Sequence, residues 1–253
     1  MIEIQKLSKK FNNNLVLNEL SLNVQTGQTC VIIGRSGCGK SVLLKHIVGL
    51  LIPDSGKVLV EGKDVAGLEE LELVALRAKI SMVFQGGALF DSMDVSENVG
   101  FSLLEHTQMS RKEIFRRAEE SLSLVGLGGI GNLMPSELSG GMKKRVALAR
   151  AICIKPEIIL YDEPTTGVDP ITAEGINELI RSLHDKLKVT SLVVTHDMNS
   201  AYHIADKVAM MYKGKIIIEG SPQQIQETRD PVVHQFIHGL SKGPITEAID
   251  ISK

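Results

Sequence analysis

One stretch, GRSGCGKS at residues 34–41, restricts the fold of this chain more than any other feature of its sequence. The apolar run Thr29–Ile33 precedes it and Val42-Leu43-Leu44 follows it, so it connects a buried strand to a helix. Glycines let backbone N–H groups curve around phosphate oxygens, and the helix directs the positive end of its dipole at the same anion. The pattern predicts a phosphate loop in which Lys40 contacts the β- and γ-phosphates of a nucleotide. The residues expected to bind the nucleotide here are Gly34, Arg35, Ser36, Gly37, Cys38, Gly39, Lys40 and Ser41.

Short β-branched runs alternate with helical patterns along most of the chain. Three of these runs, in 29–33, 158–161 and 191–195, are continuously apolar, which is typical of parallel strands covered on both faces. The last two runs flank Lys213-Gly214 and predict a hairpin at a sheet edge. We therefore expect an α/β fold with strands at Ile2–Leu7, Leu20–Val24, Thr29–Ile33, Lys57–Val60, Ile80–Phe84, Ile158–Tyr161, Ser191–Thr195, Val208–Tyr212 and Lys215–Glu219.

Strand signals vanish between Phe90 and Arg150. Within this region Arg111–Val125 has helical spacing, with its apolar residues on one side of the helix. We interpret it as a helical insert, at about residues 90–150, in an α/β core formed by residues 1–89 and 151–240.

Composition narrows the class of protein. A formal net charge of −2 argues against a general nucleic-acid binder, which is usually basic. The three cysteines form no metal-ligand spacing and no even set of pairs, which favours a reducing cytoplasm. No apolar run reaches the roughly 18–20 residues that span a bilayer, and the N-terminus does not resemble a signal peptide. We expect a soluble protein whose membrane role, if it has one, comes through a partner.

Four polar residues follow predicted strands. Asp162 and Glu163 end the run Ile158–Tyr161, at the edge of a parallel sheet where ligands bind. We expect Asp162 to hold Mg²⁺ together with the Ser41 hydroxyl, and Glu163 to polarise the attacking water. His196 and Gln85 end two other runs. Taken alone, each is explained equally well by a structural or strand-terminating role and by a contact to the γ-phosphate.

A second anion-binding helix start is predicted at Leu138–Met142, LSGGM. Ser139 is a good N-cap, and Gly140 and Gly141 expose the first N–H groups of the helix. Both helix starts cannot easily reach one nucleotide from a single chain, so we expect a dimer in which this segment covers a nucleotide held by another subunit. A plain helix cap stays open. We expect the following Lys143, Lys144 and Arg145 to form a solvated helix face.

Taken in order, Gly34–Ser41, Gln85, LSGGM, Tyr161–Pro164, Gly167–Asp169 and His196 resemble the motifs of ATP-binding cassette (ABC) ATPases, over essentially the whole chain. The resemblance implies an ABC ATPase domain at 1–240 with a RecA-like P-loop core, an antiparallel β-subdomain and a helical subdomain. It also implies two cassettes with two ATP molecules between them. The roles it implies are general base for Glu163, γ-phosphate contact for His196, Mg²⁺ and water contact for Gln85, linkage of the two sites for Asp169 and adenine stacking for Phe11, where tyrosine is commoner.

Met142, in place of the usual glutamine, points to one branch, together with Phe84–Phe101, Leu133–Met142 and Gln235–Ile245. These segments resemble the ATPases of Mla/Mce-type transporters, which move phospholipids between membranes. The branch implies membrane permease subunits and a membrane-anchored, lipid-binding Mce-domain protein as partners, at the cytoplasmic face of the inner membrane. The segment Gln85–Glu97 and the helical insert would contact the permease. The tail 241–253 would reach the neighbouring cassette, unless it is disordered.

Three alternatives stay open. An ABC transporter for an amino acid, a metal or a drug uses a similar cassette. Non-transport cassettes of DNA repair or translation usually carry a long coiled-coil insertion or two cassettes in one chain, and neither is evident here. A small-molecule phosphotransferase would leave LSGGM unexplained. We expect no nucleic-acid partner.

Overall fold

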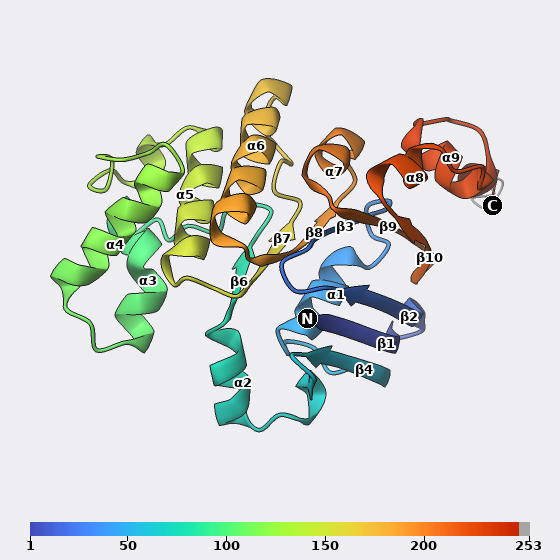
Figure 1. Cartoon of the computed structure of the whole chain (residues 1–253), viewed down its shortest axis with the longest axis horizontal. Coiled ribbons are helices and arrows are strands. Elements are labelled where there is room, and N and C mark those ends of the chain that lie inside the picture. Colours follow the sequence, from blue (N-terminus) through green and yellow to red (C-terminus); the bar gives the residue numbers. More distant parts are fainter. Residues whose placement is uncertain (248–253) are drawn as a thin grey trace.

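The chain forms two β-sheets with helices on both sides of the larger one, in a computed structural model that describes residues 1–247 (Figure 1). The larger sheet has the strand order β10-β9-β3-β8-β7-β6, and all its pairs are parallel except β9 with β10. The α/β class with a mainly parallel sheet is therefore confirmed. These strands are β3 (Thr29–Ile33), β6 (Ile80–Val83), β7 (Ile158–Asp162), β8 (Thr190–Thr195), β9 (Lys207–Tyr212) and β10 (Lys215–Gly220).

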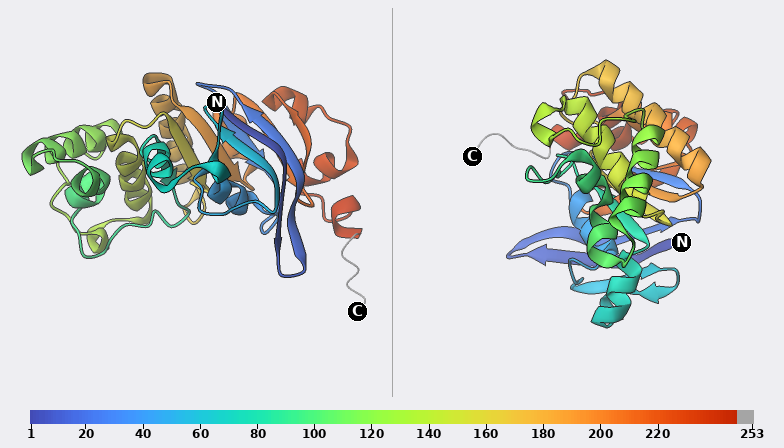
Figure 2. Two further views of the ribbon diagram at one scale, coloured as in Figure 1. Left: turned by 90° about the horizontal axis from the view of Figure 1, so that it is seen from below. Right: turned by 90° about the vertical axis from the view of Figure 1, so that its left-hand side faces the viewer.

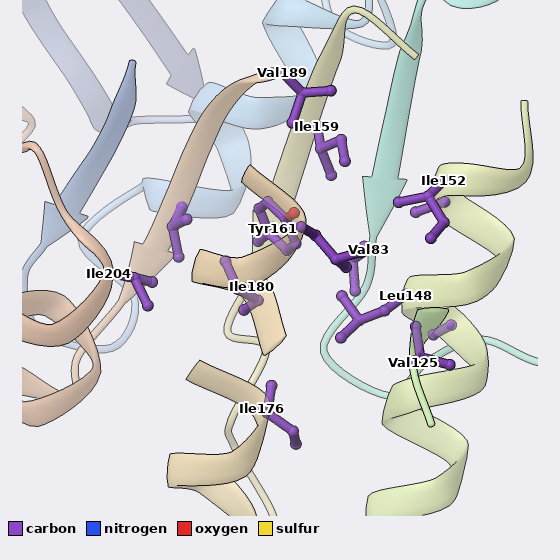
Figure 3. Close-up of a cluster of buried hydrophobic side chains, with 14 of the residues drawn as sticks. Val83, Val125, Leu148, Ile152, Ile159, Tyr161, Ile176, Ile180, Val189 and Ile204 are labelled. Atoms are coloured by element: carbon purple, nitrogen blue, oxygen red, sulfur yellow. The ribbon is translucent and has the colours of Figure 1, made fainter. Parts of the chain in front are cut away.

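The strands of the larger sheet are apolar throughout because each face packs into a separate core. In β7, Ile158 and Leu160 pack with α1 (Lys40–Ile47) and the smaller sheet. The alternate residues Ile159 and Tyr161 face the other way, toward α5 and α6. Figure 3 shows this second core around Tyr161. The helices that cover this second face are α5 (Gly140–Cys153), α6 (Pro170–Leu187) and α7 (Met198–Ile204).

The smaller sheet is antiparallel, with the order β2-β1-β4-β5. The hairpin of β1 and β2 extends to Phe11 and Asn14, several residues beyond the predicted strands. The prediction stopped short because the polar KKFNNN stretch carries no strand signal. β5 has only two residues and was missed. The second hairpin was predicted correctly, since Lys213 and Gly214 both adopt positive φ and join β9 to β10. The strands of this sheet are β1 (Ile2–Phe11), β2 (Asn14–Val24), β4 (Ser55–Val60) and β5 (Lys63–Asp64).

Three helices lie between β6 and β7, and Figure 2 shows two of them, α3 and α4, at one end of the molecule. They are α3 (Val95–His106), α4 (Arg111–Leu124) and α5, which extends past the predicted insert boundary at residue 150. The side of α4 predicted to be apolar is buried, including Ile114, Ala118 and Leu122. α2 (Glu70–Arg77) precedes β6. The division into core and insert stays a prediction. Across residues 1–247, no helix combines the length and the apolar character needed to cross a bilayer.

The C-terminal helices lie at the other end of the molecule (Figure 2). The buried side-chain amide of Gln235 closes this region, because it accepts from Ile245 N at 2.8 Å and donates to Leu240 O at 3.1 Å. Ile245 is itself buried in the larger core. Residues 241–247 of the predicted tail are thus folded onto their own chain, and the rest, 248–253, lie outside the described residues. The helices are α8 (Pro222–Gln226), α9 (Pro231–Ile237) and α10 (Pro244–Glu247).

Candidate functional site

The phosphate loop connects β3 to α1, as its sequence predicts. Gly39 adopts φ 109°, and a Cβ there would lie 3.0 Å from Val16 Cγ1, so only glycine fits without strain. Lys40 is 5% exposed. Its ammonium donates to the carbonyl oxygens of Gly34 at 2.7 Å and Arg35 at 3.2 Å, which holds the charge at the loop.

Asp162 reaches the phosphate loop because of strand alternation. It lies on the same face of β7 as Ile158 and Leu160, the face that packs against α1. The Ser41 hydroxyl donates to Asp162 Oδ1 at 2.9 Å. Burial raises the pKa of Asp162, and the hydrogen bond from Ser41 opposes that shift.

These two oxygens suit a hard divalent cation. A hydroxyl and a carboxylate oxygen, here 2.9 Å apart, are the hard oxygen ligands that Mg²⁺ prefers in proteins. Among residues 1–247, no cluster of three or more His, Cys, Asp or Glu side chains could hold a metal ion. A cation here would therefore need further oxygens, such as those of phosphates and water.

Glu163 is buried and contacted on two sides, by Lys40 and by His196. Its Oε1 lies 3.4 Å from Lys40 Nζ, and its Oε2 lies 2.8 Å from His196 Nδ1. The Thr166 and Thr195 hydroxyls donate to the same Oε2 at 3.2 and 3.4 Å. The backbone of Glu163 is left-handed, with φ 51°, which is costly for a residue other than glycine and typical of functional sites.

His196 and Gln85 share a cleft with these groups. Since the Glu163 carboxylate can only accept, His196 Nδ1 is the donor in their contact. His196 follows β8 and Gln85 follows β6, so both come from the carboxyl edge of the parallel sheet. The neighbouring Asp197 is the N-cap of α7 and accepts from Asn199 N at 3.0 Å.

The cleft has a volume of about 420 Å³. A larger hollow of about 790 Å³ lies over the smaller sheet, but none of the predicted site residues lines it. We therefore take the smaller cleft as the candidate site, because it unites residues from the loop and three strand ends. Its lining residues are Val16, Ser36, Gly37, Gly39, Lys40, Ser41, Val42, Gln85, Glu163 and His196.

The LSGGM segment is not part of this cleft. Ser139 caps α5 by accepting from Met142 N at 3.3 Å, and Ser139 and Gly140 are exposed. Within the described chain, neither they nor Gly141 line the cleft. A Cβ at Gly141 would lie 2.7 Å from Thr172 Cγ2, and the Thr172 hydroxyl donates to Asp169 at 2.5 Å. Asp169, the N-cap of α6, is thus beside this segment.

Four of the expected nucleotide contacts, Phe11, Gly34, Arg35 and Cys38, are not among the residues that line the cleft. Phe11 is 40% exposed at the end of β1, with the Lys9 ammonium 5.8 Å from its ring centroid, and it is not among the lining residues. Cys38 lies within the loop, where burial raises the pKa of its thiol.

The prediction of a solvated face at Lys143–Arg145 was wrong for Lys144, which is 7% exposed. Its ammonium donates to the carbonyl oxygen of Gln85. A signal for burial was available, because Ala147, Leu148 and Ala151 follow at helical spacing and form the buried face of α5. Thr166 and Thr195 carried no such signal.

Comparisons with known proteins agree on one family. The model described as ABC transporter matches residues 17–166. The chain is 42% identical to the intermembrane phospholipid transport system ATP-binding protein MlaF of Haemophilus influenzae, over 97% of this chain and 93% of that protein. It is 39% identical to the probable ribonucleotide transport ATP-binding protein mkl of Mycobacterium leprae, over 96% of this chain and 70% of that protein. A dimeric ATP-binding cassette in a post-hydrolysis state, bound to ADP and Pi, matches with a TM-score of 0.80 at 33% identity, over 88% of this chain and 99% of that one.

Proposed function

The chain belongs to the ABC transporter family of ATPases, and from this premise we propose that it powers the movement of phospholipid between membranes. The single observation that carries the choice of cargo is the similarity to a phospholipid transport ATP-binding protein along almost the entire length of both chains. Hydrolysis of ATP is the chemistry of the family, and the cleft holds the groups that this reaction needs.

In the proposed mechanism, the N–H groups of the phosphate loop and the Lys40 ammonium bind the triphosphate. Glu163 accepts a proton from the attacking water, and His196 orients the Glu163 carboxylate through the 2.8 Å contact. Ser41 and Asp162, together with Gln85, would hold Mg²⁺, which supplies positive charge to the phosphates.

The proposed assembly is a pair of cassettes. Ser139 and Gly140 are exposed, Gly141 is half-buried, and all three lie outside their own cleft, so this helix start is available to contact the γ-phosphate bound by a second copy. A γ-phosphate held from both sides draws the copies together, and its hydrolysis removes that contact. The similarity to a dimeric cassette supports this arrangement.

The proposed partners are integral membrane permease subunits and a membrane-anchored Mce-domain protein that binds lipid. We place the chain at the cytoplasmic face of the inner membrane, held there through the permease. The segment 85–97 and helices α3 and α4 would make that contact. Residues 248–253, in the tail proposed to reach the other cassette, lie outside the described structure.

Ribonucleotide is the second candidate cargo, because it appears in the name of the mycobacterial relative. The cassette does not touch cargo in either case, so its own site does not distinguish them. Amino acids, metals and drugs are weaker candidates, since neither of these two relatives carries such a name.

The test is to purify the tagged full-length chain from membranes with its partners and to identify the bound molecules. We expect phospholipid to co-purify, and the reconstituted complex to transfer labelled phospholipid between vesicles only with hydrolysable ATP. The same complex with Glu163→Gln should assemble but not transfer. Bound ribonucleotide, other than the ATP site's own ligand, and no lipid transfer would refute the proposed cargo.

A further inference from the structure

Two cations of α5 hold the segment that follows β6. The Lys144 ammonium donates to the carbonyl oxygen of Gln85. The Arg150 guanidinium donates to the carbonyl oxygens of Gly87 at 2.6 Å and Ala88 at 2.7 Å. One helix therefore binds three carbonyls within the four residues 85–88.

These contacts satisfy charges that have no carboxylate partner. Within residues 1–247, neither Lys144 nor Arg150 forms an ion pair, and burial lowers the pKa of both. Glu163 acts on Lys144 only at longer range. A buried cation without hydrogen bonds is costly, so the carbonyls of the segment matter most to the buried Lys144 and less to the half-buried Arg150.

The shape of the segment also depends on α5. Gly87 and Ala88 both have positive φ, at 76° and 48°, and the second is unfavourable for a residue with a side chain. A Cβ at Gly87 would meet Lys143 O at 3.5 Å and Ala147 Cβ at 3.7 Å, so the backbone lies directly on the helix. The segment therefore takes its conformation from its contact with α5.

The geometry thus connects two parts of the proposed machinery. Gln85 lines the cleft, as do Lys40 and Glu163. The helix that holds its backbone begins at the Ser139 cap, which is exposed for a second copy. Lys144 is only five positions along the chain from Ser139, in the second turn of the helix.

We propose that Lys144 is a positioning residue, which fixes the backbone of Gln85 to α5 and so keeps Gln85 in place at the cleft. Arg150 holds the second half of the same segment. The inference rests on the proposed role of Gln85 in ATP hydrolysis. Lys144 itself touches neither nucleotide nor water and acts only through Gln85.

The first test is a double-mutant cycle in the full-length protein, with Lys144→Met, Gln85→Ala and both changes together. Misplacing Gln85 should lower kcat about tenfold to hundredfold in Lys144→Met and leave nucleotide affinity within about twofold. In the Gln85→Ala background the same change should cost less than about twofold, because the side chain that Lys144 positions is gone. An equal loss in both backgrounds would overturn the proposal.

Two further variants separate positioning from stability. Lys144→Arg keeps a long cationic donor and should recover most of kcat, whereas Lys143→Met, one residue away, should behave like the wild type. Thermal unfolding of each variant shows whether it is folded. If Lys144→Met lowers kcat and Lys144→Arg does not recover it, the specific contact to Gln85 is not responsible.

The second test does not depend on activity. The chain has no tryptophan, so Phe84→Trp places a single tryptophan next to Gln85. Adding Lys144→Met to this protein should lower the tryptophan anisotropy and increase its quenching by acrylamide, and adding Lys143→Met should not. An unchanged anisotropy would overturn the anchoring. If the wild type does not hydrolyse ATP, the proposed function fails, yet this measurement still decides whether Lys144 holds the segment.

Discussion

Replacing Glu163 by glutamine should separate ATP binding from ATP hydrolysis. The change keeps the size of the side chain and removes the negative charge that faces Lys40 at 3.4 Å. At an effective dielectric constant of about 20, this attraction amounts to about 5 kcal/mol. In the wild type an incoming phosphate must compete with Glu163 for the Lys40 ammonium, and the carboxylate also repels it.

We therefore expect Glu163→Gln to bind ATP at least as tightly as the wild type, and up to about tenfold more tightly. Most of the 5 kcal/mol would not appear in the difference in affinity. When ATP binds to the wild type, Glu163 keeps its contacts with His196 and two threonines, and water replaces part of the attraction to Lys40 that is lost. The rate of hydrolysis should fall by about 10²–10⁴-fold with the loss of the proton acceptor.

The assay is nucleotide binding by isothermal calorimetry, together with phosphate release measured at saturating ATP. Glu157→Gln is the matched control, because Glu157 lies before the other end of β7 and its partner Lys79 is 3.1 Å away, but the pair is exposed. It should change neither quantity, since exposed pairs contribute about 1 kcal/mol or less. Weaker ATP binding with an unchanged rate in Glu163→Gln would refute the assignment of the base.

Three further predictions concern stability and assembly. Burial raises the pKa of Cys30 from 9.0 to about 12, so the unfolded chain loses this proton first and the free energy of unfolding falls as pH rises above 9. At pH 10.5 the loss measured by urea unfolding should be about 2 kcal/mol. Cys30→Val should lack this part of the pH dependence. Ile245→Ala should cost about 2–5 kcal/mol, because the side chain is 5% exposed, whereas the exposed Leu240→Ala in the same segment should cost little; equal effects would contradict the packing of this segment. Ile171 is 86% exposed beside Asp169, the residue proposed to link the two sites, so Ile171→Glu should reduce the ATP-dependent dimer of Glu163→Gln at least tenfold in light scattering. The equally exposed Leu71→Glu on α2 should not. A full dimer in the Ile171 variant would argue against a contact between the two copies at Ile171.

Most of the fold follows from patterns within the sequence. The parallel strands are recognisable because both of their faces are buried, so the apolar runs are unbroken, and the Lys213-Gly214 pair marks the β9–β10 hairpin by its backbone preferences. The long hairpin of β1 and β2 was cut short, because its outer part is exposed and polar and is held by backbone pairing. The family itself was predicted correctly from its motifs.

The gathering of Lys40, Asp162, Glu163 and His196 could be anticipated, because strand ends of one parallel sheet meet at one edge. Two features could not. The left-handed turn at Glu163 has no marker such as glycine or asparagine, and it is stabilised by contacts distant in sequence. Lys144 and Arg150 of α5 are residue types that usually lie on the surface, and only the position of the loop backbone shows that both donate to its carbonyls. The roles of the site residues stay predictions.

The left-handed backbone of Glu163 costs stability at the residue proposed as the general base. Positive φ costs a residue with a side chain on the order of 1–2 kcal/mol, a cost that glycine avoids and asparagine reduces. Glycine or asparagine at position 163 would remove this strain, but Lys40 and His196 would lose their carboxylate partner. The strained turn is therefore kept because it places the carboxylate between these two residues, and selection for thermostability alone would not relieve it.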